Sequence, residues 1–308
     1  MLLITIYLGI GRRHTIPLKT YNFRKMKKII VLISFFSLII CAAPGRVNAQ
    51  IIDGAYKRSD VADRKPMVLP TPREADIFWS KMIWRIIDLR EKMNEPLYYP
   101  TTPINDRISL INLLLQGIES GQITAYDARN DDEFKTPLTY QEVKDQFGAQ
   151  TTTERVMDFN TGEYVNREVK GEIHPNEVKE IMVKEEWYFD KQTSSLNVRI
   201  IGLCPIREYT RADDPTGQVV RTQLFWVYYP EVRKLLATHD VFNPDNNAQS
   251  MTFDDLFIKR YFSSYIIEES NTFNNRAITQ YLSGKDAMYE SQRIENEIFN
   301  FEQDLWEY

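Results

Sequence analysis

Hydrophobic positions along the chain follow a helical period at both ends and a strand period in the middle. Apolar residues in the stretch 74–93 recur three and four positions apart, which predicts a long amphipathic helix. Residues 109–119 predict a second helix on the same grounds. Residues 137–147 predict a third, which Gly148 should stop. The first part of the folded chain is therefore expected to be mainly helical.

Alternation of apolar and polar residues then predicts two β-hairpins. In residues 151–170, an Asn-Thr-Gly triplet at positions 160–162 separates two alternating runs, a pattern typical of a hairpin. Residues 178–190 and 196–206 alternate on either side of a polar turn and predict the second hairpin. Around residues 200–203 both faces become apolar, which indicates a strand end that is covered on two sides.

The rest of the central region is expected to mix strands with short helices. Residues 219–229 and 260–270 predict two more strands. Pro230 begins a short helix, because proline is tolerated in the first helical turn. Residues 251–260 predict another helix of one or two turns.

The C-terminal segment predicts a helix from Asp286 onward, without glycine or proline to interrupt it. Its apolar residues step by four, three and four positions, the spacing of a coiled-coil seam. Terminal residues this apolar are expected to dock on the domain itself or on a partner. The candidate docking residues are Ile294, Ile298, Phe301, Leu305 and Trp306.

Together these elements predict an α+β fold with a helical N-terminal part, central antiparallel β-hairpins and a C-terminal helix. We expect a single domain over residues 74–308. Residues 50–73 mix charge and proline with little periodicity, and are interpreted as an extended arm.

The N-terminal residues 26–49 have the order of a secretory signal peptide. Met26 and two lysines precede about a dozen apolar residues, and small residues follow near a cleavage site before Gln50. Residues 1–25 do not fit this pattern and are interpreted as a non-native extension, which leaves Met1 and Met26 as alternative starts. Lipidation of Cys41 is disfavoured, because Ile40 stands where a lipoprotein signal has a small residue.

Charge narrows the class of partner. Residues 1–49 carry eight of the 38 Lys and Arg and none of the 43 Asp and Glu, so residues 50–308 have a formal charge of −13. This balance disfavours nucleic acid and anionic lipid as main partners, since both require clustered cations. It is compatible with a basic patch on another protein. No stretch after residue 50 is apolar enough to span a membrane.

Three residues are candidates for chemistry, and each has a simpler interpretation. His174 could be a general base, but it stands at a chain break typical of a loop histidine. His239 beside Asp240 could form a catalytic pair, although a histidine at a helix C-terminus is favoured by the helix dipole. Cys204 could be a nucleophile, but a lone cysteine in an apolar strand is more often a small buried residue.

Cation-binding and phosphate-binding patterns give no stronger candidate. The acidic pairs at 131–132, 213–214 and 254–255 lack the spaced oxygen ligands of a calcium loop. The Gly-rich phosphate loop, the HExxH and CxxC patterns and the GxSxG elbow are absent from the sequence. We therefore predict no catalytic residue, no cofactor and no metal site.

Four long blocks of the sequence are distinctive. They read KEEWYFDKQTSSLNVRIIGLCPI, LFWVYYPEVRKLLATHDVFNP, MTFDDLFIKRYFSSYIIEESN and IFNFEQDLWEY, in this order. Together with the upstream block IFWSKMIWRIIDLREKMNEPLYYP, they resemble the GldN family, also called PorN. This family belongs to the gliding-motility and type IX protein secretion machinery of Bacteroidota.

The resemblance implies a function that composition does not reveal. It implies a non-enzymatic periplasmic subunit that associates with an outer-membrane lipoprotein, GldK or PorK, and self-associates in a ring under the outer membrane. It also implies a connection to the motor components GldL and GldM, or PorL and PorM, and it implies no cofactor. The alternative is an exported ligand-binding protein or hydrolase, with an aromatic pocket built from Trp187, Tyr188, Tyr228 and Tyr229.

Overall fold

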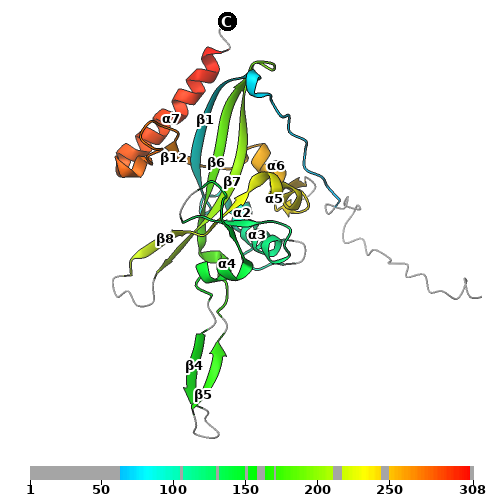
Figure 1. Cartoon of the computed structure of the whole chain (residues 1–308), viewed down its shortest axis with the longest axis vertical. Helices are drawn as coiled ribbons and strands as arrows, with labels where there is room; N and C mark the ends of the chain where they lie inside the picture. Colours follow the sequence, from blue (N-terminus) through cyan, green and yellow to red (C-terminus); the bar gives the residue numbers. More distant parts are fainter. Residues whose placement is uncertain are drawn as a thin grey trace, which may run out of the picture. The chain divides into compact units, whose positions relative to one another are not determined.

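The computed structural model describes one compact unit within Ser59–Tyr308 (Figure 1). The described residues are 63–104, 107–129, 132–149, 152–157, 164–169, 171–210, 217–243 and 250–305. The expected N-terminal extension, the signal peptide and the first part of the arm lie outside them. The α+β fold class is confirmed, because the unit combines a large antiparallel sheet with separate helices.

The sheet is built around three long antiparallel strands in the order β1, β6, β7 (Figure 1). β12 pairs with the outer edge of β1, while β9 pairs with β7 and continues through β2 to β3. β8 pairs with the C-terminal part of β7. The bounds are β1 Ile77–Asp88, β2 Ala125–Asp127, β3 Pro137–Leu138, β6 Val178–Asp190, β7 Ser195–Thr210, β8 Val219–Gln223, β9 Phe225–Tyr228 and β12 Tyr265–Glu269.

The helix predicted over residues 74–93 is wrong, and this stretch forms the short 3-10 helix η1 (Glu74–Asp76) followed by β1. Every residue from Ile83 to Ile87 is at most 5% exposed, because both faces of β1 are covered. A strand buried on both faces is apolar at nearly every position, so its period of two is lost in the sequence. The β-branched isoleucines in the run agree with a strand.

The second predicted hairpin is confirmed as β6 and β7, which pair from Val178–Arg207 to Asp190–Ser195. A register shift lies between Lys184 and Glu185, where the ladder skips a residue of β7. The first predicted hairpin is also present, as the antiparallel pair β4 (Thr152–Met157) and β5 (Tyr164–Val169). Its expected turn at 160–162 lies outside the described residues.

The helices predicted after the first stretch are confirmed, with small differences in their bounds. Local capping explains two of the helix starts: Ser109 accepts a hydrogen bond from the backbone of Asn112, and Thr139 forms a capping box with Glu142. The helix bounds are α2 Glu95–Tyr98, α3 Leu110–Glu119, α4 Tyr140–Gln146, α5 Tyr229–Leu236, α6 Phe253–Ile258 and α7 Lys285–Asp304. Two 3-10 helices, η2 (Pro175–Glu177) and η3 (Ile278–Gln280), also occur.

Two predicted strands are shorter than expected. The run 219–229 is divided at Leu224 into β8 and β9, and Tyr229 already belongs to α5. Within residues 260–270 only Tyr265–Glu269 forms a strand. A small separate pair, β10 (Asp240–Val241) with β11 (Met251–Thr252), precedes α6.

The long sheet has one face covered by helices, the helical face, and one covered mainly by the loop after β2, the loop face. Sequence neighbours on the strands alternate between two hydrophobic clusters, as the strand period requires. Ile87, Val183, Leu203 and Val227 belong to the main core with residues of α2 to α6, whereas Ile86, Met182, Cys204 and Trp226 belong to the cluster on the loop face.

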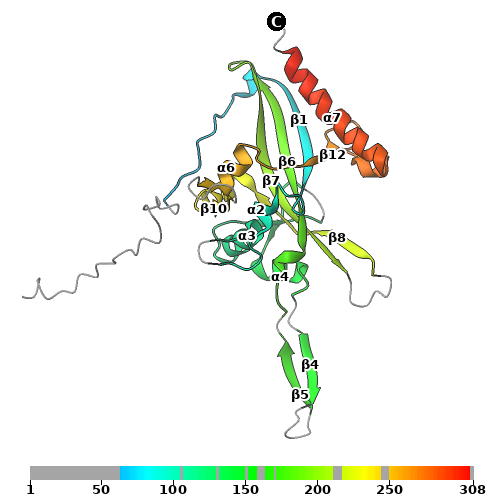
Figure 2. The ribbon, with the colours of Figure 1, turned by 180° about the vertical axis from the view of Figure 1, so that it is seen from behind.

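A third cluster occupies the other end of the helical face. Ile83 of β1 and Ile266 of β12 pack there against Ile294 and Ile298 of α7, which are 0% and 4% exposed. Both views show α7 beside β1 and β12, away from α3, α5 and α6 (Figures 1 and 2). The sheet therefore supports two separate helical layers.

The described part of the arm, residues 63–73, contacts the domain through two backbone carbonyls and through the side chain of Arg64, which reaches Ser250 and lies 3.7 Å from Asp240. Arg233 of α5 donates a hydrogen bond of 2.6 Å to the carbonyl of Met67, and Arg199 of β7 donates to the carbonyl of Pro70. The side chain of Val68 between them is 91% exposed. The extended character predicted for this part of the arm agrees with these contacts.

A single aromatic ring fixes the loop after β2 on the loop face. Phe134 has a φ of 56° and packs edge-to-face against Tyr126, Trp226 and Tyr228. Gly202 of β7 lies directly beneath this ring, where an added Cβ would be 2.5 Å from the ring carbon Cζ. The close approach requires a residue without a side chain at position 202.

Candidate functional site

The candidates for nucleophilic and acid–base chemistry do not come together. Cys204 has no exposed surface, and its thiol is 3.7 Å from the carbonyl of Pro205. Burial raises the pKa of this thiol well above its usual range, so it is not the thiolate that nucleophilic attack requires. His174 precedes η2 at the surface, and Nδ1 of His239 lies 3.0 Å from Thr238 Oγ1, just after α5 ends. Both histidines have the positions that the simpler interpretation predicted.

The acidic pairs that the structure describes have structural partners. Asp255 is the third residue of a capping box at the start of α6: its backbone N–H donates to the hydroxyl of the N-cap residue Thr252, and its carboxylate accepts from Thr252. Asp254 is 2% exposed and receives two hydrogen bonds from Arg233, at 2.8 and 3.0 Å. The hydroxyl of Tyr229 donates a third at 3.0 Å, and burial raises the pKa of this tyrosine. Asp131 and the pair 213–214 lie outside the described residues.

The four residues of the alternative aromatic pocket are spread over different parts of the sheet. Trp187 packs with the cluster under α7, whereas Tyr229 belongs to the main core. Tyr188 follows Trp187 directly and so points to the opposite face of β6. Tyr228 is 42% exposed beside Phe134. The aromatic pocket is therefore not assembled.

The predicted seam on α7 faces the chain's own sheet. Because Ile294 and Ile298 are buried against Ile83 and Ile266, a partner would reach them only after α7 had left the sheet. Phe301 is half-buried and stacks against Trp79 of β1, with 4.7 Å between ring centroids.

In this structure Ile294 and Ile298 dock on the domain itself, the first of the two alternatives, and their assignment as partner contacts stays a prediction. The physical reason is the shape of the sheet: β12 extends its edge and offers α7 an apolar surface in the same chain. Leu305 is half-buried at the helix end, and Trp306 lies outside the described residues.

A buried charged layer separates the two helical layers. Glu185 of β6 has no exposed surface, and Arg260 donates to its two oxygens at 2.7 and 3.3 Å. Trp187 Nε1 donates to the same carboxylate at 3.1 Å. Nε of Arg85 lies 3.4 Å from Oε2, close enough for attraction but outside hydrogen-bonding geometry.

This charged layer also holds α7. Nη1 of Arg85 is 3.1 Å from Oε1 of Glu295, so β1 and α7 are joined by an ion pair next to the buried isoleucines. Ser291 of α7 accepts a hydrogen bond of 3.0 Å from the backbone N–H of Ile266. We call Arg85, Glu185, Arg260 and Glu295 the buried charged layer. In it two cations pair with two anions: Arg85 and Glu185 are buried, whereas the side chains of Arg260 and Glu295 are 30% and 46% exposed at its edges.

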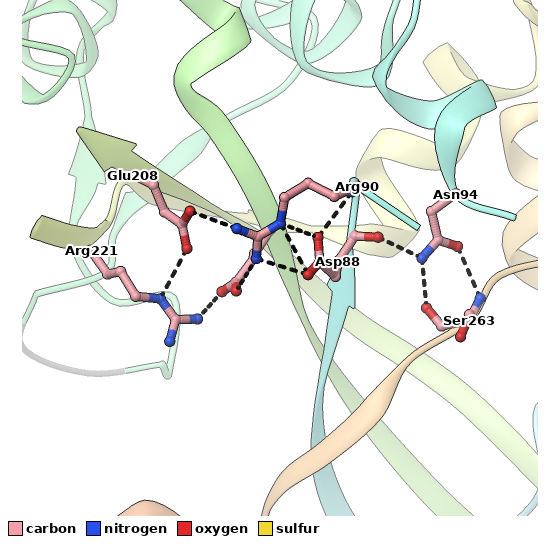
Figure 3. Close-up of polar contacts among 7 residues, drawn as sticks. Asp88, Arg90, Asn94, Glu208, Arg221 and Ser263 are labelled. Atoms are coloured by element: carbon pink, nitrogen blue, oxygen red, sulfur yellow. Dashed lines mark hydrogen bonds and ion pairs between the residues drawn. The ribbon is translucent and has the colours of Figure 1, made fainter. Parts of the chain in front are cut away.

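A second ionic network joins four strands (Figure 3). It lies at the C-terminal ends of β1 and β7, the N-terminal end of β6 and the middle of β8. Arg90 holds Asp88 through paired contacts of 2.8 Å, which lower the pKa of that carboxyl, and it also reaches Glu208 at 3.1 Å. Arg221 contacts Glu208 and the buried carboxylate of Glu180. Four strands are thus joined at one corner by charge-assisted hydrogen bonds.

The fully buried Asn94 extends this corner (Figure 3). Its amide nitrogen donates to the carbonyls of Asp88 and Ser263, and its amide oxygen accepts from the N–H of Ser263. Through these bonds the chain after α6 is fixed to the end of β1.

A third charged group lies on the loop face. Asp132 accepts a hydrogen bond of 2.7 Å from Trp84 Nε1 and pairs with Lys184 Nζ at 2.9 Å. Burial raises the pKa of nearby Glu268 to about 7; the Asp132 carboxylate adds to this effect and Lys184 opposes it. This group and Phe134 together hold the loop after β2.

Across the described ranges, no three acidic, histidine or cysteine side chains gather closely enough to hold a metal ion. Helices long and apolar enough to cross a bilayer are likewise absent from the described ranges. The buried charges described above pair with one another between strands and helices.

Sequence reasoning missed the buried charged layer. Its signal was a single charged residue inside an apolar run, as with Arg85 between Trp84 and Ile86. Such a residue is compatible with the polar face of a helix, and a helix was predicted there. With β1 recognised as a doubly covered strand, Arg85 becomes a buried cation that requires an anionic partner.

Comparison with known proteins gives one family. A family model described as gliding motility associated protein GldN matches residues 72–307. This range includes all the helices and strands described above. No curated protein matches the chain.

Proposed function

Because the chain belongs to the GldN family of gliding-motility-associated proteins, we propose that it is a non-enzymatic structural subunit of the type IX protein secretion and gliding machinery. In this proposal it works in the periplasm, after export by the signal peptide at residues 26–49. It associates there with an outer-membrane lipoprotein of the GldK or PorK type and forms a ring with further copies. The GldL/PorL and GldM/PorM motor components are its expected neighbours.

The observation that carries the proposal is the family match over residues 72–307. The fold supports a structural role in a second way. Cys204 is buried as a thiol, and the carboxylates of Asp254, Glu185 and Glu180 are each engaged by an arginine. Satisfied buried ion pairs of this kind fix the relative positions of strands and helices, which is compatible with a structural subunit.

Deletion of the gene and purification of the protein test the proposal together. Deletion should abolish gliding and stop the secretion of many proteins at once. The protein extracted in mild detergent should purify with a lipoprotein as an assembly much larger than one chain. Retained secretion in the deletion strain, or a protein that runs as a monomer in native membrane extracts, would overturn the proposal.

The same experiments address an exported enzyme or ligand-binding protein. Such a protein should run alone and should lose function through one point change, for example His174→Ala. The scaffold should tolerate this change, because His174 is exposed at the start of a 3-10 helix.

A further inference from the structure

Between Met288 and Gln303 the outward face of α7 is uncharged, with Lys285 continuing it in the first turn and Arg293 at its edge. The residues that point away from the sheet are exposed, and three of them are large: Met288 at 73%, Tyr289 at 71% and Phe299 at 56%. The face consists of Met288, Tyr289, Gln292, Asn296, Phe299, Asn300 and Gln303. On an exposed helix of a protein in which 26% of residues are charged, a face of seven uncharged residues is unusual.

The spacing along this face is that of a coiled-coil seam. Tyr289, Gln292, Asn296, Phe299 and Gln303 step by three, four, three and four positions. This repeat keeps side chains aligned toward a second helix. From Tyr289 to Gln303 the seam is about 20 Å long at the rise of an α-helix. It lies opposite Ile294 and Ile298, so α7 has one seam on the sheet and a second one outside.

Acidic residues border the outward seam on both sides. Glu290, Glu297 and Asp304 recur at seven-residue intervals on one side, where Arg293 also lies. Glu302 stands on the other side, together with Glu295, whose carboxylate pairs with Arg85 of β1. The helix carries two basic against six acidic residues, a formal charge of −4. One of the two cations, Arg293, is already held by Glu290 at 2.8 Å and Glu297 at 3.0 Å.

The acidic borders decide which occupant fits. In a pair of α7 helices from two copies of this chain, acidic borders would face acidic borders whichever way the helices ran, and like charges across an interface disfavour association. A helix with Lys or Arg beside its own seam would instead be attracted. Aromatic and methionine side chains, enriched at the centres of protein interfaces, are present on α7 at Met288, Tyr289 and Phe299.

A shallow open hollow lies along one side of the outward face. Its lining includes Tyr289 and Asn296 of the seam but not Met288 or Phe299, and the full set is Tyr289, Gln292, Arg293, Asn296, Glu297, Asn300, Phe301 and Asp304. The inner residues hold the helix in place, so the seam is presented on a rigid element, which reduces the entropy lost on binding.

We propose that the outward face of α7 is a docking surface for an amphipathic helix of a different protein, whose apolar seam is flanked by Lys and Arg. Phe299, Tyr289 and Met288 are the central contacts. Glu297 and Asp304 on one side, and Glu302 on the other, select the basic flanks. All of these contacts lie on α7, and they do not depend on the identity of the machinery in the proposed function.

In-cell photo-crosslinking tests this surface. A photoreactive phenylalanine analogue replaces Phe299 in the full chain, and in a control it replaces Val219 of β8, which is 57% exposed. Position 299 should give an adduct with another protein, and position 219 should not give that adduct. Mass spectrometry should place the attachment on a helical peptide with Lys or Arg beside its apolar residues.

Charge reversal provides the second arm of the experiment. In the crosslinking background, Glu297→Lys with Asp304→Lys should reduce the adduct at least tenfold. The matched pair Glu74→Lys with Glu91→Lys, at exposed positions outside α7, should leave it unchanged. Thermal unfolding of each variant confirms that the chain is folded, since all four positions lie on the surface.

Three results would overturn the inference. They are an adduct between two copies of this chain, no adduct from position 299 beyond that from position 219, and an adduct that charge reversal leaves unchanged or increases. The outcome is separable from the proposed function. A basic helical partner captured in a cell whose secretion survives deletion of this gene would support the docking surface and contradict the proposed function.

Discussion

Arg260 donates to both oxygens of Glu185 although Glu185 has no contact with solvent. The arginine lies between α6 and β12, and the glutamate lies in the middle of β6. The pair therefore fixes the segment that leads to the edge strand and to α7. The backbone of Arg260 has a φ of 54°, so the chain turns sharply at the residue whose side chain makes the contact.

Removal of the Arg260 guanidinium should destabilise the folded protein. Arg260→Met leaves the buried carboxylate of Glu185 with Arg85 and Trp187 only, and we expect a loss of about 3 kcal/mol in the free energy of unfolding. Urea denaturation measures it. The matched control is Arg293→Met, which removes ion pairs of an arginine that is 54% exposed and should change stability by less than about 1 kcal/mol. Equal effects of the two variants would contradict a structural role of the buried pair.

Packing at Gly202 gives a second prediction. A Cβ at this position would be 2.5 Å from the ring of Phe134, so Gly202→Ala should lower the free energy of unfolding by about 1–3 kcal/mol. In a double-mutant cycle, Gly202→Ala should lower the free energy of unfolding less in the Phe134→Ala background than in the wild type, because the ring of Phe134 is gone. Additive effects in the cycle would show that the strain lies elsewhere.

Titration of Glu268 should contribute to the pH dependence of the free energy of unfolding. Its pKa is raised to about 7 in the folded protein from a usual value near 4.5, so the folded state binds the extra proton between these values. Stability should fall as pH rises from about 4.5 through 7, by about 1–2 kcal/mol after allowance for solvent screening of a partly exposed group. Glu268→Gln should flatten this part of the curve.

Urea denaturation from pH 4.5 to 8 compares the two proteins. Glu290→Gln is the control, since a hydrogen bond with Arg293 lowers the pKa of Glu290 and its contribution changes at more acidic pH. Identical slopes for the wild type and Glu268→Gln between pH 5 and 7 would contradict the assignment.

The thiol of Cys204 should be inert in the folded chain. Burial keeps it protonated and out of contact with solvent. Iodoacetamide at pH 8 should leave the peptide that contains Cys204 unmodified in native protein, and should modify it fully in urea. Cys204→Ser should leave secretion intact. Rapid labelling of the native thiol, or loss of activity with an unchanged fold, would restore the hypothesis of a catalytic cysteine.

The inner seam of α7 should control how firmly the helix is held. Ile298→Ala removes a buried contact with the sheet, and we expect a loss of about 2–4 kcal/mol and faster amide hydrogen exchange along α7. Met288→Ala is the control on the same helix, because this methionine is 73% exposed. Unchanged exchange in Ile298→Ala would show that the charged layer alone holds the helix.

Much of the fold could be predicted because local patterns and tertiary structure agree over most of the chain. The hairpin of β6 and β7 alternates, and α3 and α4 begin at capping residues. β1 could not be recognised, since a strand covered on both faces has no polar side to mark its period. The prediction of a helix over residues 74–93 was wrong because other parts of the chain cover both faces of β1. The sequence of residues 74–93 alone does not show this cover.

The sequence shows the apolar spacing on α7 but not the surface that covers it. The apolar spacing on α7 was correct, and Ile294 and Ile298 do form a seam. Which surface covers that seam depends on the position of β12, and this position follows from pairing with β1. Without β1 as a strand, the sheet edge under α7 could not be anticipated, and neither could the exposure of Phe299 on the other side.

The contacts of the arm have a consequence for its tolerance of mutation. Arg199 and Arg233 bind the carbonyls of Pro70 and Met67, which every amino acid supplies. Substitutions at an exposed position such as Val68 therefore leave these two bonds available, whereas a change of either arginine removes one of them. Residues of the folded domain therefore hold this part of the arm at Met67 and Pro70, and among the arm residues Arg64 contacts the domain with its own side chain, at Ser250 and Asp240.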